Sequence, residues 1–176
     1  MILLATKVRP LYHTKLIKLL YLIDEAKVKD NGVPITWLDY KVWQFGPVAP
    51  EVYFLKDGNS VFNAYIDTQK NDSGTLIVPK CEFYDGDFSD KDLEIIEDVI
   101  QKYGSMSSEG LVNITHEPNS LWSKTKEANG LDFSSSIANI SNISIDFTEL
   151  IKDDEIKLDN YHGAKDIIMF RTQFEC

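Results

Sequence analysis

The stretch TKLIKLLYLIDEAKVKDNG, residues 14–32, carries the strongest secondary-structure signal in the chain. Its leucines and isoleucines recur at helical spacing, which predicts a helix with one apolar face. Thr14 is a residue type that caps helix N-termini, and Asn31-Gly32 is a common helix end. We therefore predict an amphipathic helix whose lysines, Lys15 and Lys18, stay in water. Its buried face is predicted to contain Leu16, Leu19, Leu20 and Ile23.

Two interpretations fit the segment that follows this helix. Thr36 and Asp39 have the spacing of a capping box, which would open a short helix. Residues 40–45, YKVWQF, are aromatic and β-branched, which favours a strand, and we prefer the strand. Gly46-Pro47 should interrupt whatever precedes it, because the residue before a proline is driven out of the helical region.

The stretch WQFGPVAPEVY, residues 43–53, concentrates aromatic residues, prolines and a glycine around a single carboxylate. Pro50 suits the first turn of a new helix, where a missing N–H costs nothing, and Glu51 adds a favourable charge there. We expect this helix to end near Asp57-Gly58.

The rest of the chain alternates short elements with polar segments. Residues 59–74 have no clear period and predict irregular structure, and 75–78 (TLIV) predict a strand that Pro79 ends. Further helices are expected over 90–103, 107–115 and about 121–129. Residues 134–145 are expected to form a loop with one strand-like piece, and residues 146–149 a short capped helix. The segment IIMF at 167–170 is expected to form an appended strand or tail. In the 90–103 helix Ser89 and Asp92 should form the cap, and the buried stripe should contain Leu93, Ile96, Ile100 and Tyr103.

These elements together predict an α+β protein, predominantly helical, built as a compact helical domain with a small β-sheet or hairpin. Residues 1–130 should form the main domain. Residues 131–176 should form a C-terminal extension packed on, or appended to, the same domain.

Composition limits the class of protein. The chain has 176 residues, of which 43% are hydrophobic, so it can bury a core. No apolar run reaches the roughly 18–20 residues that span a bilayer, and the N-terminal run is too short for a secretion signal. We expect a cytoplasmic protein without membrane association. Cys81 and Cys176 lack CxxC companions and are expected to be reduced thiols.

Charge is divided unevenly along the chain. Residues 1–80 hold 10 Lys and Arg against 8 Asp and Glu, whereas residues 81–176 hold 8 against 20. The second part repels phosphate backbones, so nucleic acid is disfavoured as a partner. It favours either a basic protein partner or simple solubility.

No pattern of residues indicates catalysis, a metal site or a cofactor. The three histidines have no second ligand at helical spacing, and neither GxSxG, GxGxxG nor a P-loop occurs. The helices at 89–104 and 107–116 have the arrangement of a helix-turn-helix, but the second, SSEGLVNITH, has no Arg or Lys to contact DNA. A structural helical hairpin is the better interpretation. We expect a protein that is not an enzyme.

The motifs, taken in order, resemble the SocA-like Panacea antitoxin domain family over about residues 8–125. The members of this family combine a K-L-x-K-L-L-Y-x-x-D helix, a G-x-P-I-T turn and a W-x-Y/F-G-P-V-x-P-E-V-Y segment with a later Thr-His and Trp. The matching segments here are KLIKLLYLID (15–24), GVPIT (32–36), YKVW (40–43), FGPVAPEVY (45–53), YG (103–104), Thr115-His116 and Trp122.

The resemblance implies an antitoxin of a bacterial or phage toxin–antitoxin system, which neutralises a cognate protein toxin by direct contact. Alternatives are a transcriptional autoregulator and an adaptor that delivers a bound protein to a protease. Residues 58–80 match no family pattern that we identify, and with the part after residue 130 they are candidates for determining which toxin is bound. The candidate partner-binding residues are Lys18, Asp24, Trp43, Glu51, Tyr53, His116 and Trp122, each with a structural role as the competing explanation.

Overall fold

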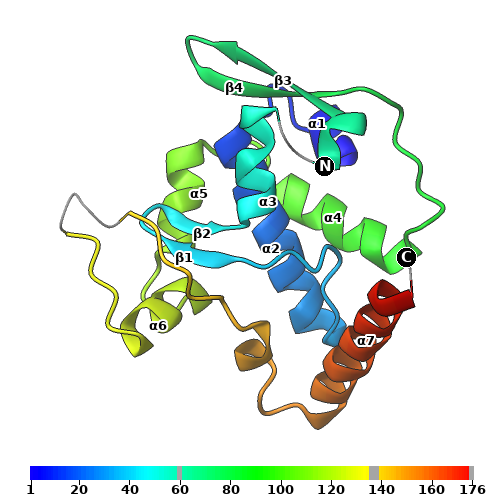
Figure 1. The fold of residues 1–176 in the computed structure, drawn as a ribbon, viewed down its shortest axis with the longest axis vertical. Coiled ribbons are helices and arrows are strands. Elements are labelled where there is room, and N and C mark those ends of the chain that lie inside the picture. Colours follow the sequence, from blue (N-terminus) through cyan, green and yellow to red (C-terminus); the bar gives the residue numbers. More distant parts are fainter. Residues whose placement is uncertain (59–60, 135–138, 175–176) are drawn as a thin grey trace.

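The protein is built around one central helix. The computed structural model describes residues 1–58, 61–134 and 139–174. Helix α2 (His13–Asn31) runs through the middle, and the other helices and two hairpins surround it (Figure 1). It ends where Gly32 takes φ 91°, and its predicted apolar face is buried, so both predictions are confirmed. The predicted cap is wrong, because the helix begins at His13 after Tyr12, without a side-chain cap.

The prediction that both lysines of this helix stay in water is also wrong. Lys18 is only 1% exposed, and Lys15 is half-buried with its Nζ donating to Gly104 O at 3.1 Å. The physical reason is that α2 has neighbours on every side over its first half, so every residue from 16 to 24 is buried. A helix enclosed in this way has no solvent face for a lysine.

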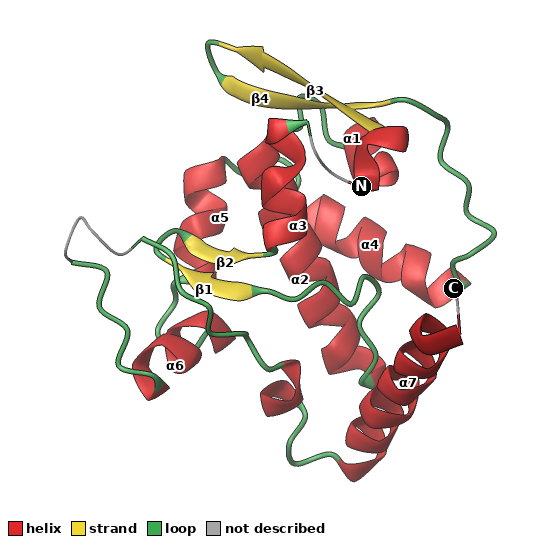
Figure 2. Cartoon of the chain, viewed as in Figure 1, coloured by secondary structure: helices red, strands yellow, loops and turns green. Residues whose placement is uncertain are grey.

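Strands β1 (Lys41–Trp43) and β2 (Gly46–Val48) form an antiparallel hairpin beside α2 (Figure 2). The strand that we preferred from Tyr40 onward is thus confirmed, although it begins one residue later, at Lys41. Gly46-Pro47 does follow the end of β1, but it forms part of the returning strand. The capping-box helix is absent, because the Thr36 hydroxyl donates to Asp24 instead.

The predicted strand-like piece within 134–145 lies against this hairpin. The carbonyl of Asn139 accepts a hydrogen bond from Gln44 N at 3.0 Å, and the carbonyl of Ile143 accepts one from Val42 N at 2.9 Å. Residues 135–138 of that segment lie outside the described residues.

The helix predicted from Pro50 is present in two parts. α3 (Pro50–Tyr53) has Pro50 in its first turn, and η1 (Phe54–Asp57) continues it as a 3₁₀ turn. Gly58, at φ 77°, ends the pair as expected.

Residues 59–74 are not irregular throughout, which corrects the prediction for this segment. After η2 (Val61–Ala64), strand β3 (Ile66–Asn71) pairs with β4 (Gly74–Pro79), the strand predicted at 75–78. Only Ile66 of β3 is buried, so a polar strand of this kind has no hydrophobic alternation to reveal it. The hairpin lies over α1 (Ile2–Lys7) (Figure 1).

The helices predicted in the second half are confirmed with small changes. They are α4 (Asp90–Tyr103), α5 (Ser108–Thr115), α6 (Leu121–Ala128) and the 3₁₀ turn η3 (Phe147–Leu150). Ser89 and Asp92 form the expected capping box of α4. The predicted stripe faces the core: Ile96 is buried, and Leu93, Ile100 and Tyr103 are partly buried against the core. The prediction missed Ile95 and Val99, which are the other buried residues of the helix.

The predicted C-terminal strand or tail is wrong, because residues 167–170 belong to a long helix, α7 (Glu155–Phe174). Its first half packs on the end of α2, where Lys157 Nζ donates to Lys29 O at 2.7 Å and Tyr161 lies 5.2 Å from the Trp37 ring. The architecture is α+β and predominantly helical, as predicted. None of the helices among residues 1–58, 61–134 and 139–174 has both the length and the apolar character needed to cross a membrane.

Candidate functional site

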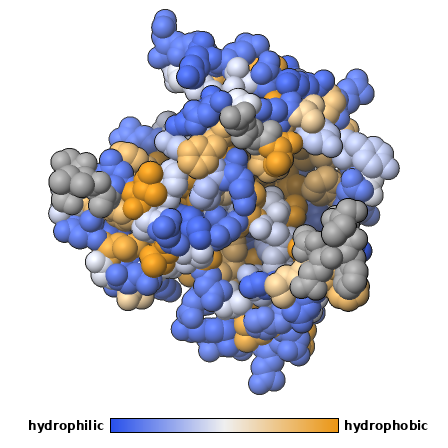
Figure 3. Space-filling model, viewed as in Figure 1, coloured by the Kyte–Doolittle hydropathy of each residue, from blue (hydrophilic) through white to orange (hydrophobic). Residues whose placement is uncertain are grey.

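A cavity of about 550 Å³ opens where α2, the β1–β2 hairpin, α3 and α5 meet. Three of the predicted site residues, Lys18, Trp43 and Tyr53, line it. Most of its surface is apolar, and Phe45 and Ile140 at its rim are 64% and 59% exposed. Figure 3 shows hydrophobic residues at the left of the molecule, where Figure 1 places the tip of this hairpin. The remaining lining residues are His13, Thr14, Ile17, Val48, Ser108, Glu109, Val112 and Asn139.

Lys18 lies in the wall of this cavity with its charge taken out of water. Its Nζ donates to Pro47 O at 2.8 Å, and no ion pair to it occurs within the described residues. Burial lowers the pKa of Lys18 to about 7. The amine is therefore half neutral at physiological pH, because an unpaired buried ammonium is costly.

The lysine fits only because residue 46 is glycine. Gly46 takes φ 97°, and a Cβ at this position would stand 2.6 Å from Thr115 Oγ1 and 2.9 Å from Lys18 Nζ. The glycine of the FGPV segment thus serves two purposes at once: it permits the left-handed turn of the hairpin and makes room for a buried side chain.

His116 and Trp122 form a second layer behind the hairpin. Their rings stack with centroids 3.9 Å apart, and Trp122 Nε1 donates to Trp43 O at 3.1 Å. His116 Nε2 is buried without a hydrogen-bond partner in the described structure. Burial, followed by the charges of Lys18 and Lys126, lowers the pKa of His116 to about 4, so the ring is neutral at pH 7. This pair supports the hairpin and does not line the cavity.

Tyr53 is the centre of an aromatic cluster at the cavity wall. It contacts Trp43, with ring centroids 4.8 Å apart, and Lys56 Nζ lies 3.7 Å from the centre of its ring. His13 packs on its other side at 5.8 Å, with its Nε2 2.9 Å from Val52 O. Burial is the main cause that lowers the pKa of His13, which favours a neutral ring that donates from Nε2.

Glu51 lies on the exposed face of α3, outside the cavity. Partial burial and the nearby charge of Asp39 raise its pKa, whereas Lys41 opposes the shift. Its carboxylate faces solvent, so it is available to a partner.

Asp24 is in a separate network at the other end of α2. It accepts from Ile35 N and Thr36 N at 2.8 Å, from Tyr40 Oη at 2.9 Å, and from the Thr36 hydroxyl. Burial raises its pKa and these hydrogen bonds lower it. With 0% exposure, Asp24 holds the GVPIT loop against the helix in this structure and presents no surface to a partner.

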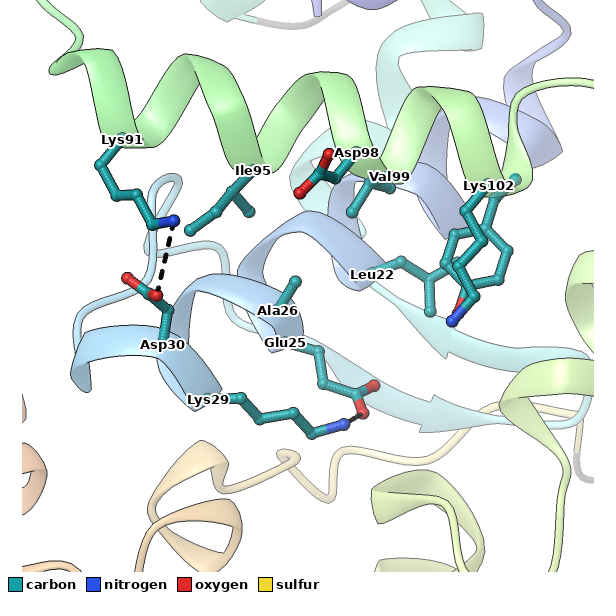
Figure 4. Close-up of a pocket in the computed structure, with 11 residues that line it drawn as sticks. Leu22, Glu25, Ala26, Lys29, Asp30, Lys91, Ile95, Asp98, Val99 and Lys102 are labelled. Atoms are coloured by element: carbon teal, nitrogen blue, oxygen red, sulfur yellow. Dashed lines mark hydrogen bonds and ion pairs between the residues drawn. The ribbon is translucent and has the colours of Figure 1, made fainter.

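A further hollow of about 470 Å³ separates α2 from α4 (Figure 4). Leu22, Ala26, Ile95 and Val99 form its apolar part, and charged side chains stand along both helices. These charges pair with each other, Lys29 with Glu25 and Lys91 with Asp30 at 4.0 Å. The hollow is a solvated seam between helices, and it holds none of the predicted site residues.

Sequence reasoning missed residues that the structure places in the cavity, chiefly His13, Phe45 and Ile140. Phe45 belongs to the FGPV motif, so its position at the tip of a turn was a usable signal for exposure. Ile140 lies almost a hundred residues away in the chain, and no local pattern connects it with the hairpin. In residues 1–58, 61–134 and 139–174, no group of three or more His, Cys, Asp or Glu is placed to hold a metal ion.

Comparison with known proteins identifies one family. The chain matched neither a curated protein nor a solved structure. A family model described as "Antitoxin SocA-like, Panacea domain" matches residues 16–123, which begin inside α2 and end inside α6. The matched region contains Lys18, Tyr53 and His116, whereas their neighbours His13 and Lys126 fall just outside it. This chain therefore belongs to the SocA-like Panacea antitoxin domain family.

Proposed function

We propose that this protein is an antitoxin that neutralises a cognate protein toxin by binding it directly, in the cytoplasm of a bacterium and without catalysis. Membership of an antitoxin-like family supports the toxin–antitoxin role in general. The observation that carries the direct-contact proposal is the exposed apolar rim of the cavity beside α2. Two large hydrophobic side chains of that rim, Phe45 and Ile140, are more than half exposed, and Phe54 next to Tyr53 is 50% exposed.

Such a rim suits the centre of a protein interface. Interfaces concentrate their binding energy in apolar and aromatic anchors that fill pockets, with charged residues outside them. Here Glu51 and Lys56 stand on α3 and η1, next to the aromatic cluster. Glu51 and Lys56 would then be charged residues at the edge of such an interface, outside the cavity.

A protein partner fits the electrostatics better than nucleic acid. Helix α5 carries no Lys or Arg, and the acidic second half of the chain would repel phosphate. The same charge would attract a basic toxin.

The test is co-expression with the product of the adjacent gene. We expect that product to arrest growth alone, to be harmless together with this chain, and to co-purify with it. The double variant Phe45→Ala/Ile140→Ala should lose neutralisation while keeping its thermal melt, because both side chains are exposed. Ile156→Ala, an equally apolar change at an exposed position of α7, is the matched control and should neutralise like the wild type. A neighbour that is harmless and does not co-purify would refute the proposal.

A further inference from the structure

Another pocket, of about 450 Å³, is lined by residues that belong to none of the family motifs quoted above, although most of them lie within the matched region 16–123. It is bounded by the start of α1, by η2 and β3, and by the segment 81–88 that leads into α4. In Figure 3 hydrophobic residues line a hollow at the upper right, where Figure 1 places this segment opposite α1. We call it the aromatic pocket, and its rings belong to Phe62, Tyr65, Phe83, Tyr84 and Phe88.

Several of these rings are available to a ligand. Tyr84 is 72% exposed and Tyr65 is 56% exposed, which is unusual for large aromatic side chains outside an interface. Phe83 and Phe88 are half-buried and pack against each other, with ring centroids 5.5 Å apart and ring planes tilted by 46°. The pocket therefore combines two exposed rings with a partly buried pair.

The charge around the aromatic pocket is strongly negative. Glu82 and Asp87 line it, and residues 81–98 contain eight Asp and Glu against a single lysine. Neither of the two lining carboxylates forms an ion pair in the part of the chain that the structure describes.

The cations near the pocket do not neutralise these carboxylates. Lys80, whose backbone N donates to Tyr65 O at 2.8 Å, directs its Nζ to Asn63 O at 2.7 Å. Met1 also lines the pocket, and burial lowers the pKa of its amino group to about 6, so that group carries little charge at neutral pH.

Aromatic faces and carboxylates together recognise one class of group. The face of an aromatic ring attracts a cation, and a carboxylate accepts hydrogen bonds from it, most effectively from the planar guanidinium of arginine. We infer that the aromatic pocket binds an arginine side chain of the basic partner protein, and so helps to determine which toxin this antitoxin accepts. This inference rests on the proposed function, because it names a contact for the same partner.

The position of the aromatic pocket supports a role in partner choice. Its residues come from the N-terminus, from the 58–80 segment, which lies between the family motifs, and from the acidic segment after it. Tyr53 of the cavity and Phe62 of the aromatic pocket are joined by η1 and the start of η2. In this proposal one partner places an apolar anchor in the cavity and an arginine in the aromatic pocket.

The first experiment needs no toxin. The full chain, at low salt, is titrated with N-acetyl-arginine-N-methylamide while the aromatic ¹H–¹³C signals of Tyr65, Phe83 and Tyr84 are followed by NMR. We expect saturable shifts that added salt reduces and that Tyr84→Ala or Glu82→Gln/Asp87→Asn weakens. The citrulline analogue, which has the same shape without the charge, should cause no comparable shifts. Equal shifts with both compounds, or none with arginine, would overturn the inference.

The second experiment uses the co-purified partner. Tyr84→Ala and Glu82→Gln/Asp87→Asn should each weaken its binding by about 5- to 30-fold, the range expected for a cation–aromatic or charge contact shielded from water. Asp153→Asn, an exposed carboxylate beyond η3, is the charge control and should bind like the wild type. If the wild-type chain neutralises the partner and the pocket variants bind that partner as tightly as the wild type, the inference is wrong and the proposed function still stands. If the neighbouring product is no partner at all, the proposed function fails, and the NMR titration alone decides whether the pocket takes arginine.

Discussion

At the scale of single residues, Lys18 is the least expected feature of the protein. It is a lysine in the core with one hydrogen bond, from Nζ to Pro47 O, and with its ammonium removed from water. Such a group destabilises the folded state whenever it is charged.

The first prediction concerns the pH dependence of stability. The pKa of Lys18 falls from 10.5 in the unfolded chain to about 7 in the folded one. Between these values the unfolded chain holds one proton more, so the free energy of unfolding rises with pH, by on the order of 1 kcal/mol per pH unit. Lys18→Met removes this contribution, so its stability relative to the wild type should fall steadily between pH 7 and 10.

Urea denaturation at several pH values measures this difference. Lys15→Met, the same change at a half-buried lysine of this helix, is the control for replacing an ammonium group by an apolar thioether. Parallel stability curves for Lys18→Met and the wild type would show that Lys18 is not a buried cation.

The second prediction concerns Asp24, which connects α2 to the GVPIT loop. Asp24→Ala leaves the donors of Ile35, Thr36 and Tyr40 without their acceptor, and two of these are backbone N–H groups. Unsatisfied buried donors of this kind should lower the free energy of unfolding by about 3 kcal/mol. Glu51→Gln, at an exposed carboxylate, should change it by less than about 0.5 kcal/mol. Chemical denaturation compares them, and equal losses would contradict the assigned role of Asp24.

At the scale of elements, the β1–β2 hairpin depends on one glycine for its shape and for its contact with α2. Gly46 combines a positive φ with a close approach to Thr115 and Lys18, whereas Gly58, at φ 77°, has no atom within 4 Å of the Cβ position. The two glycines therefore separate the cost of backbone conformation from the cost of a steric clash.

The third prediction follows from that pair. Gly58→Ala should cost about 1 kcal/mol of unfolding free energy, which is the strain of a left-handed alanine. Gly46→Ala carries the same strain and must also displace Thr115 or Lys18, so its cost should be about 2–4 kcal/mol. Thermal and urea denaturation of both variants measure the difference. Similar losses at the two positions would mean that the hairpin moves away from α2 at little cost.

At the scale of the whole molecule, the uneven charge of the chain gives the fourth prediction. Residues 81–176 carry a net charge of −12 that would draw in a basic toxin. Association of the purified pair should therefore slow by about tenfold or more between low salt and 0.5 M NaCl, because the Debye length shortens from tens of Å to a few Å. Surface-immobilised binding kinetics measure the rate. A rate that does not change with salt would remove charge as the basis of recognition.

The apolar cavity and the aromatic pocket should respond differently to salt. Partner contacts made by Phe45 and Ile140 would be hydrophobic and would act mainly on the dissociation rate, whereas carboxylates such as Glu82 would act on the association rate. The two surfaces can thus be distinguished by kinetics on one complex.

Much of this architecture could be predicted from local patterns. Ser89 and Asp92 identified the start of α4, Gly32 the end of α2, and Pro50 the start of α3, because caps and breakers act within a few residues. The family signature, with its FGPVAPEVY segment, was also readable in the chain, and the family match confirms it. Strand β3 escaped prediction because its residues are polar, and α7 because its isoleucines and Phe170 are not confined to one face.

Local patterns in the chain were enough to predict the capped helices, the fold class and the family, since each of these depends on short-range chemistry or on ordered motifs. Only the tertiary structure decided the environments of the candidate residues: that Lys18 is buried, that Asp24 is internal, and that Ile140 meets Phe45 at one cavity. The physical reason is that burial, and with it pKa and availability to a partner, depends on which segments distant in the chain pack together. No periodicity within a single segment contains that information.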